Sequence, residues 1–276
     1  MKKLLGILAA MALLLGCFSL NLSAETPDSI NITVNLTAKG QLQVAEKSTR
    51  VSDVDSDGKI TVNDALTIAH DESFPGGAAA GYGTKNTDYG LSIVKLWGIE
   101  QGYSYGYYIN DQAAWSLNDV LKEGDCLYAF AYKDAENATD RYSFFDRHAL
   151  EAKAGDEITL TLKKYEYGPD YETLTLPVYR AKITLNGKET EYETDENGKV
   201  TLRLDEAGRV LIGAVDKEGI LVPPVCIATV KGEQTPMVTP GKTPTGDHSE
   251  WVVLLAMVSA SGALLCLKKQ IHAKEN

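Results

Sequence analysis

Apolar and polar residues alternate in two short segments, 30–34 and 41–44, on either side of a Lys-Gly pair. This period of two predicts a β-hairpin. Residues 62–70 instead carry apolar side chains at helical spacing, which predicts an amphipathic helix, and the glycine-rich residues 74–90 are expected to form a loop. Three further segments are strand-like, namely 91–97, 106–109 and 125–132. Short strands around one helix predict a β-grasp-like α+β domain over residues 28–147.

The pattern becomes all-β from Ala152 onwards. Apolar and polar residues alternate in the segments 157–162, 181–185 and 200–204. The dipeptides Asn186-Gly187 and Asn197-Gly198 favour tight turns between such strands. The run 194–202 resembles the immunoglobulin-like (Ig-like) modules of bacterial surface proteins, in which this turn is structural. Residues 148–231 are therefore predicted to form an Ig-like β-sandwich.

Apolar runs lie near both ends of the sequence. Residues 1–24 combine two lysines, an apolar run and a small residue before a candidate cleavage point, which predicts a secretory signal peptide. The residues around Cys17 also resemble a lipoprotein box, in which that cysteine would be acylated. Residues 251–267 are apolar and uncharged, and the tail 268–276 starts with two lysines, which predicts a single transmembrane helix with a cytoplasmic basic tail. The residues between the two runs are then extracellular and anchored at the cell surface.

Residues 232–250, which are rich in Thr and Pro, are predicted to be a linker. Within them, residues 242–247 read Lys-Thr-Pro-Thr-Gly-Asp and resemble the sorting signal of Gram-positive surface proteins, which sortase cuts between Thr and Gly. The resemblance implies processing between Thr245 and Gly246, with sortase as a partner. The usual leucine is missing and the proline lies one place late, so attachment to the cell wall and anchoring by the membrane helix alone both stay open.

The composition suits an extracellular protein. The formal net charge is −11, which argues against nucleic acid or an anionic membrane face as a partner. Cys126 and Cys226 are the cysteines outside the terminal apolar runs. A disulfide between them is one alternative, but we expect two buried small side chains, because the sequence does not indicate a disulfide-stapled core.

Residues 53–64 have the ligand pattern of a calcium-binding loop. Side-chain oxygens occur at loop positions 1, 3 and 5, glycine at 6 and a carboxylate at 12. The predicted Ca²⁺ ligands are Asp53, Asp55, Asp57, the Lys59 carbonyl, Thr61 or a water in its place, and Asp64. The alternative is an acidic turn before a capped helix, but three alternating aspartates would then repel one another with no compensating ion.

The same loop, with aspartate at position 12 followed by Ala-Leu, resembles a dockerin repeat. Dockerins bind cohesin modules in assemblies that degrade polysaccharides, and they carry two such loops packed together. One loop is found here, and Ala65 is smaller than the usual apolar residue. We therefore expect a calcium-binding loop that stabilises another kind of domain, and the less expected alternative is true docking of a cohesin-like partner.

Residues 28–147 also resemble the bacterial relatives of the C-terminal domain of transcobalamin. The resemblance rests on three short motifs, at 61–66, 106–110 and 121–125. Ile109 and Asp111 replace the valine and glycine that are usual in that family. The resemblance implies a β-grasp-like fold and makes a corrin-like small molecule one expected ligand.

Aromatic residues gather between positions 103 and 115. The predicted ligand-binding residues are Tyr103, Tyr105, Tyr107 and Trp115, whose faces could stack on a sugar ring or a flat cofactor, with neighbouring Asn110, Asp111 and Gln112 as hydrogen-bonding groups. The alternative is structural, because tyrosine is a common strand residue that must pack somewhere.

No motif of a catalytic centre appears in the sequence. The sequence therefore predicts a non-enzymatic, calcium-binding surface protein of a Gram-positive bacterium that captures a carbohydrate or a small molecule. The alternative is a dockerin-like scaffold or adhesion component that docks a partner protein in polysaccharide degradation.

Overall fold

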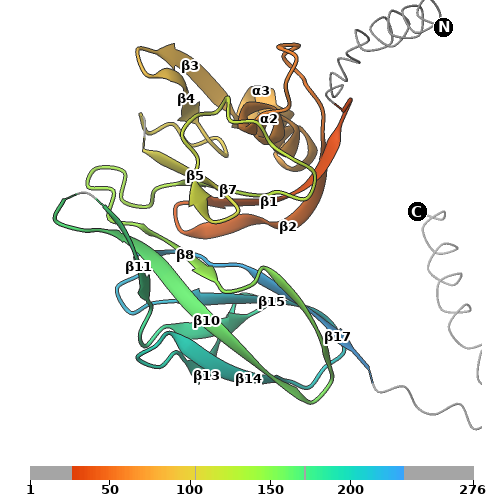
Figure 1. Ribbon diagram of the computed structural model, residues 1–276, viewed down its shortest axis with the longest axis vertical. Coiled ribbons are helices and arrows are strands. Elements are labelled where there is room, and N and C mark those ends of the chain that lie inside the picture. Colours follow the sequence, from red (N-terminus) through yellow and green to blue (C-terminus); the bar gives the residue numbers. More distant parts are fainter. Residues whose placement is uncertain (1–26, 103, 171, 233–276) are drawn as a thin grey trace, which may run out of the picture. The chain divides into compact units, whose positions relative to one another are not determined.

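Strands make up most of the described part of the chain. The computed structural model describes residues 27–102, 104–170 and 172–232, and these contain two helices, α2 and α3, among many strands (Figure 1). The expected α+β fold is therefore wrong. Segments without a clear apolar alternation still form strands here, because neighbouring strands and packing decide strand formation more than local pattern does. The all-β expectation for residues 148–231 agrees loosely with the structure.

The expected transmembrane helix is not supported either. None of the helices in the described residues is long and apolar enough to cross a membrane. The predicted signal peptide 1–24 and the predicted span 251–267, together with the tail 268–276, lie outside the described residues. The sorting-like pair Thr245 and Gly246 lies outside them as well.

The first sheet has five strands in the order β2-β1-β7-β5-β6. Their bounds are β1 (Ile30–Ala38), β2 (Gln41–Val51), β5 (Tyr105–Ile109), β6 (Gln112–Ala113) and β7 (Cys126–Ala131). β1 and β2 form the predicted hairpin, which turns at Lys39 and Gly40 with φ values of 50° and 73°. β1 also pairs in parallel with β7, so it lies inside the sheet and is buried along most of its length.

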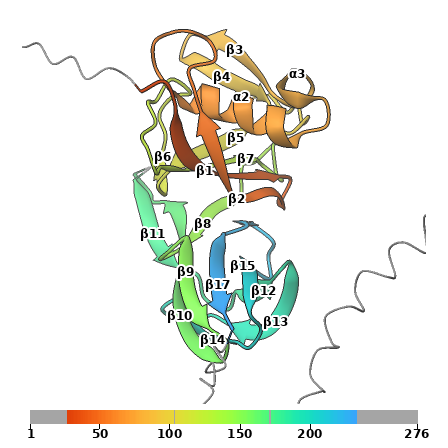
Figure 2. The same ribbon diagram turned by 90° about the vertical axis from the view of Figure 1, so that its right-hand side faces the viewer.

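Helix α2 (Val62–Ser73) covers one face of the first sheet (Figure 2). Its buried apolar residues are Val62, Ala65, Leu66 and Ala69, which fall on one side of a helix as the sequence predicts. They join a core formed with the inward side chains of β1, β2 and β7. A capping box between Thr61 and Asp64 begins the helix, and Phe74 ends it.

The segment expected to be a glycine-rich loop is ordered into elements. It forms α3 (Gly77–Gly81) and β3 (Gly83–Thr87), and β3 pairs in a hairpin with β4 (Gly90–Lys95), which largely coincides with the predicted strand 91–97. Gly76 and Gly77 have φ values of 89° and 70°, so glycine is needed there to turn the chain into α3. Most residues of β3 are polar and half-buried or exposed, and therefore the strand has no apolar period that the sequence could reveal.

The second half of the structure is a sandwich of two sheets. The second sheet has the order β11-β10-β8-β16, with β14 also paired to β10, and the third has the order β13-β12-β15-β17-β9. Their bounds are β8 (Arg141–Phe145), β9 (Ala149–Lys153), β10 (Asp156–Tyr167), β11 (Thr173–Pro177), β12 (Lys182–Leu185), β13 (Lys188–Glu193), β14 (Lys199–Leu204), β15 (Gly208–Val215), β16 (Leu221–Val222) and β17 (Cys226–Lys231). A single apolar core lies between the two sheets, as in other sandwiches.

The two Asn-Gly turns of this half behave differently. Asn186 and Gly187 close the β12–β13 hairpin with φ values of 50° and 79°, as predicted. Asn197 and Gly198 instead link β13 of the third sheet to β14, which pairs with β10. This second turn is tight, as predicted, because Gly198 N donates to the Asp195 carbonyl at 2.9 Å. It carries the chain from one layer of the sandwich to the other instead of closing a hairpin.

A third apolar cluster joins the first sheet to the sandwich. Along β7, Leu127 and Ala129 face the helix-covered core, whereas Tyr128 and Phe130 face the opposite way. Such alternation is the ordinary consequence of the pleat. Tyr128 and Phe130 pack with Tyr142 and with residues near β16 and β17. Both faces of the first sheet are therefore covered by protein along β7.

Candidate functional site

The calcium-type loop connects β2 to α2 and brings three carboxylates together. The carboxylate oxygens of Asp53, Asp55 and Asp57 lie within 4.8 Å of one another. Asp53 is half-buried, and the other two side chains are exposed. Partial burial, and then the nearby carboxylates of Asp64 and Asp57, raise the pKa of Asp55. The cluster is a place where negative charge accumulates, and a cation would relieve that repulsion.

Backbone hydrogen bonds to the aspartates shape the loop. The Asp53 carboxylate accepts from the backbone N–H groups of Asp57 at 3.2 Å and Gly58 at 2.8 Å. Asp57 accepts from the backbone N–H of Lys59 at 2.9 Å. Gly58 has a φ of 87°, which permits the sharp bend. These contacts hold the aspartates in a tight turn that begins the twelve-residue pattern of a calcium loop.

Asp64, the predicted ligand at position 12, is fully buried and is not in the group of three carboxylates. Its Oδ1 accepts from Val54 N at 3.0 Å, and its Oδ2 accepts from Thr61 N and Thr61 Oγ1, both at 2.8 Å. Thr61, the predicted position 9, is therefore part of the capping box. The structure brings Asp53, Asp55 and Asp57 together and uses Asp64 and Thr61 to join the two ends of the loop.

The donor set tests which ion would fit. Carboxylate and carbonyl oxygens without sulfur or nitrogen suit a hard cation, and Ca²⁺ accepts irregular geometry better than Mg²⁺ does. A carboxylate oxygen that accepts one hydrogen bond still has a lone pair with which it can bind a cation. The residues present therefore fit Ca²⁺, with Asp53, Asp55 and Asp57 as the ligands already in place.

Asn63 connects this loop to the interior. Its Nδ2 donates to Asp55 Oδ2 at 3.2 Å, and its Oδ1 accepts from the Tyr82 hydroxyl at 3.1 Å. Burial raises the pKa of Tyr82, and the neighbouring Tyr107 adds to that shift. The side chains of Asp55, Asn63 and Tyr82 thus form a hydrogen-bonded chain, and Tyr82 packs against the same core as Tyr107, a residue that lines a pocket.

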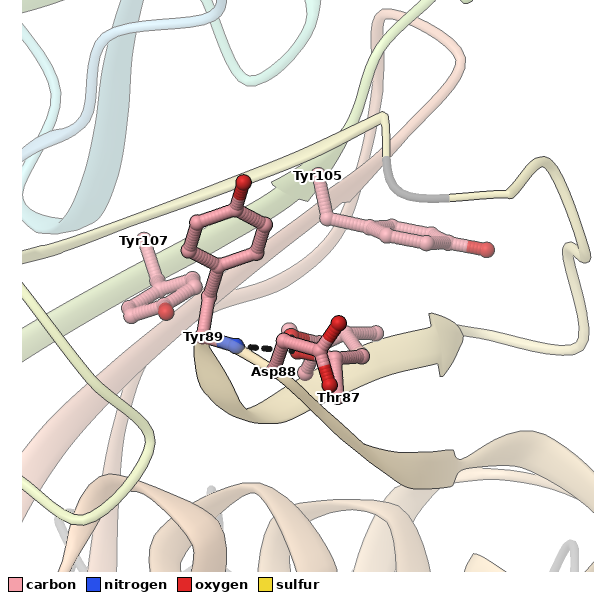
Figure 3. A pocket seen from close by; sticks show the side chains of 7 residues that line it. Thr87, Asp88, Tyr89, Tyr105 and Tyr107 are labelled. Atoms are coloured by element: carbon pink, nitrogen blue, oxygen red, sulfur yellow. Dashed lines mark hydrogen bonds between the residues drawn. The ribbon is translucent and has the colours of Figure 1, made fainter.

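That pocket lies between the β3–β4 hairpin and β5 and has a volume of about 490 Å³. It is lined by Thr87, Asp88, Tyr89, Ser92, Ile93, Tyr105 and Tyr107. Figure 3 shows the rings of Tyr105 and Tyr107 on either side of Tyr89, with Thr87 and Asp88 on the hairpin below them. Tyr105 and Tyr107 are two residues apart on one strand, and therefore both face the pocket.

The pocket combines one fixed aromatic wall with one exposed aromatic ring. The Tyr105 hydroxyl lies 2.8 Å from the carbonyl oxygens of both Val94 and Ile99, which share its one proton, and it accepts from Gln101 N at 3.0 Å. Its ring is therefore held in place. Tyr89, at the tip of the hairpin, is 100% exposed, and its backbone N–H donates to Thr87 Oγ1 at 3.2 Å.

The other predicted aromatic residues are not part of this pocket. Trp115 is 95% exposed and lines a second cavity of about 430 Å³ with Tyr165 and Tyr167. Tyr103 lies outside the described residues. The structure therefore brings Tyr105 and Tyr107 together and separates Trp115 from them.

Several tyrosines have a structural role, which was the alternative to ligand binding. Tyr108 and Tyr142 stack with ring centroids 3.7 Å apart and an interplanar angle of 5°. Tyr142 and Tyr165 donate to the side chain and backbone of Asp111, both at 2.7 Å. Asn110 bonds to Asp125 and to Cys126 N, so this polar segment stabilises the fold.

The pattern of the sequence did not reveal the hairpin residues that line the pocket. Thr87 and Asp88 lie in the segment 74–90, which was expected to be a loop, and Ser92 lies in the predicted strand 91–97 without having been named as a candidate.

Both cysteines outside the terminal runs are free, and Cys226 is buried whereas Cys126 is half-buried.

The fold and the site together define a strand-rich protein with a small aromatic pocket and an acidic loop. Comparison of the chain with protein-family models and with curated proteins finds no match.

Proposed function

We propose that this chain is an extracellular, calcium-binding protein of a Gram-positive cell surface that captures a carbohydrate or a small molecule of similar size. The observation that carries the proposal is the cavity of about 490 Å³ whose walls include Tyr105 and Tyr107. Pockets that bind small ligands commonly have volumes of about 300–1,000 Å³ and combine aromatic surface with a few polar groups. A carbohydrate of one or two rings suits this cavity better than a corrin, which would protrude from it.

The chemistry of the lining favours a neutral ligand with hydroxyl groups. Aromatic faces offer apolar area to the C–H face of a sugar, and Thr87 and Ser92 offer hydroxyls beside them. Asp88 is the charged residue of the lining and can accept hydrogen bonds from sugar hydroxyls. An anionic ligand would meet both this carboxylate and a chain with a formal net charge of −11.

The same composition supports binding rather than catalysis. Asp88 is exposed at the tip of the hairpin, and the other titratable groups of the lining are tyrosines. Burial raises the pKa of both Tyr105 and Tyr107, so their hydroxyls stay protonated near neutral pH. A paired general acid and base is not part of this lining.

Calcium would be held by Asp53, Asp55 and Asp57, and it would supply the positive charge that their clustering lacks. A neutralised cluster would keep Asp55 in place for its hydrogen bond from Asn63, which in turn accepts from Tyr82. Calcium is therefore expected to fix Tyr82, which packs against the same core as the pocket residue Tyr107. The extracellular location remains a prediction from residues 1–24, which lie outside the described residues.

A glycan array probed with the full-length protein in calcium tests the proposal. Tyr89→Ala is the informative variant, because Tyr89 is fully exposed and its loss should leave the fold intact. Tyr179→Ala is the matched control, since Tyr179 is 50% exposed and does not line the pocket. We expect Tyr89→Ala to weaken retention by about 2- to 10-fold, the value of one aromatic contact. Equal retention by wild type and both variants would overturn the proposed binding site.

The exposed face of the acidic loop supports a second candidate function, docking of a partner protein. Val54 is 45% exposed between Asp53 and Asp55, and apolar side chains in such a position can contact a partner. A cohesin-like partner captured in calcium and released by a chelator would support this function. Capture that persists in Val54→Ser would contradict it.

A further inference from the structure

A second group of metal-ligating side chains lies outside the pocket and the acidic loop. Glu46 of β2, Cys126 at the start of β7 and His148 immediately before β9 each direct one ligand atom toward a common point. These atoms lie within 4.8 Å of one another, and all three residues are half-buried. The three come from distant parts of the chain, so the fold and not a local motif brings them together.

A β-bulge turns Glu46 toward this point. β1 and β2 shift register between Val34 and Leu36, so that Ala45 and Glu46 together lie opposite Asn35. Glu46 has a φ of 45°, a conformation that a non-glycine residue rarely adopts. Bulges commonly redirect one side chain and occur next to functional sites.

Asn35 holds two of the three residues in position. It is fully buried, and its Nδ2 donates to Glu46 Oε1 at 2.8 Å and contacts Cys126 Sγ at 3.5 Å. Its Oδ1 accepts from Glu46 N at 2.7 Å. Oε1 of Glu46 and Sγ of Cys126 thus converge on one neutral amide.

The spacing of the ligand atoms suits a tetrahedral ion. Cys126 Sγ and Glu46 Oε1 are 4.0 Å apart. Zinc bonds of about 2.0–2.3 Å place neighbouring tetrahedral ligands roughly 3.3–3.8 Å apart. A small inward movement of these two side chains brings their ligand atoms into this range.

The donor set selects the class of metal. One thiolate, one imidazole and one carboxylate suit Zn²⁺ and related transition metals, whereas Ca²⁺ and Mg²⁺ prefer oxygen alone. Asp111 Oδ2 lies 3.0 Å from Nε2 of His148. A carboxylate in that position orients the imidazole, as outer carboxylates do at many histidine-ligated metals.

We propose that Glu46, Cys126 and His148 bind one Zn²⁺ ion, which ties the first sheet to the sandwich. Glu46 and Cys126 belong to the first sheet, and His148 leads into β9 of the third sheet. Binding removes the proton from Cys126 and releases it to solvent. Three protein ligands leave a fourth position, which water fills.

Titration of the metal-stripped, full-length protein without a histidine tag tests the site. Co²⁺ is the first probe, because a cobalt–thiolate bond gives a charge-transfer absorption that oxygen ligands do not give. We expect one equivalent of Co²⁺ to produce this absorption, and Zn²⁺ to displace it, in buffer with excess calcium that occupies the acidic loop.

Matched variants separate this site from adventitious binding. Cys126→Ser should lose the absorption, whereas Cys226→Ala should keep it, because Cys226 is not in the group. Asp111→Asn keeps the shape of the side chain that contacts His148 but removes its charge, and it should weaken Zn²⁺ binding by about 10- to 100-fold. The absence of the absorption in wild type, or an unchanged absorption in Cys126→Ser, would overturn the proposal.

A measurement on wild type keeps the proposal testable if Cys126→Ser does not fold. Alkylation of the thiols can be followed residue by residue by mass spectrometry with and without Zn²⁺. We expect Zn²⁺ to slow the alkylation of Cys126 at least 10-fold and to leave Cys226 unaffected. Equal alkylation of Cys126 in both conditions would contradict the site.

Discussion

The hydroxyl of Tyr82 donates to Oδ1 of Asn63 at 3.1 Å. The same amide donates from Nδ2 to Asp55 Oδ2 at 3.2 Å, so one side chain links the acidic loop to Tyr82. Tyr82 and the pocket residue Tyr107 both pack against the first core. The Tyr82–Asn63 contact is therefore the proposed link between the calcium site and the ligand pocket.

Tyr82→Phe should weaken the effect of calcium on ligand affinity. The substitution removes the hydroxyl and keeps the ring, so the core should remain packed. A single hydrogen bond contributes about 0.5–1.5 kcal/mol, which corresponds to about 2- to 10-fold in affinity. Calorimetric titration of a sugar identified on the array, in calcium and in chelator, measures the ratio of affinities. A ratio equal to that of wild type would show that the Tyr82–Asn63 contact carries no coupling.

Calcium should raise the melting temperature of the full-length protein. At a concentration 100 times the dissociation constant, an ion that binds only the folded state adds about 2.7 kcal/mol. For a chain of this size the shift should be roughly 5–10 °C. Asp55→Asn should lose the shift, and Glu196→Gln, an exposed acidic residue of the Asn197 turn, should keep it. A shift of equal size in both variants would argue that calcium binds elsewhere.

Gly198→Ala should destabilise the sandwich more than Gly187→Ala does. Both glycines have positive φ values, of 72° and 79°. A Cβ at position 198 would lie 2.3 Å from the Leu162 carbonyl oxygen, whereas nothing lies within 4 Å of one at position 187. We expect a loss of about 1–2 kcal/mol at 187 from backbone strain and about 2–5 kcal/mol at 198. Urea unfolding gives both values, and equal losses would contradict the close approach of β14 to β10 at this turn.

Mild acid should destabilise the fold through His70. Its Nδ1 lies 2.6 Å from the Leu66 carbonyl, and its Nε2 accepts from Trp97 N at 3.0 Å, so the ring is neutral with the proton on Nδ1. Burial lowers the pKa of His70 below its usual value of about 6.5. The unfolded chain therefore binds a proton before the folded one does, and stability falls as pH decreases below about 6.5.

His70→Gln isolates this contribution. The variant is less stable at neutral pH, because it loses the packing of the ring, but its stability should change less between pH 7 and pH 5.5. Urea unfolding across this range gives the two slopes. Parallel slopes for wild type and His70→Gln would show that folding does not shift the pKa of His70.

Local patterns predicted the elements that local contacts build. The alternation of β1 and β2 and the apolar face of α2 arise within neighbouring residues, and both are found in the structure. The acidic loop could likewise be recognised from Asp53 to Gly58, because its shape depends on hydrogen bonds within that segment.

Pairing between distant segments could not be predicted in the same way. β1 pairs in parallel with β7, and β9 pairs with β17, although long stretches of chain separate the partners. β3, which ends at Thr87, has no apolar period, so its segment was expected to be a loop. The meeting of Glu46, Cys126 and His148 depends on these distant pairings and on a bulge, and no spacing in the sequence reveals it.

Calcium-dependent capture at the tyrosine-lined pocket is best tested by comparing four samples on one glycan array. Wild type and Tyr107→Ala would each be applied in millimolar calcium and in excess chelator, with the melting temperature of each checked beforehand. We predict that wild type is retained in calcium, that retention falls in chelator, and that Tyr107→Ala is retained weakly in both. Retention of the folded Tyr107→Ala variant at the wild-type level, or wild-type retention that ignores the chelator, would contradict this function.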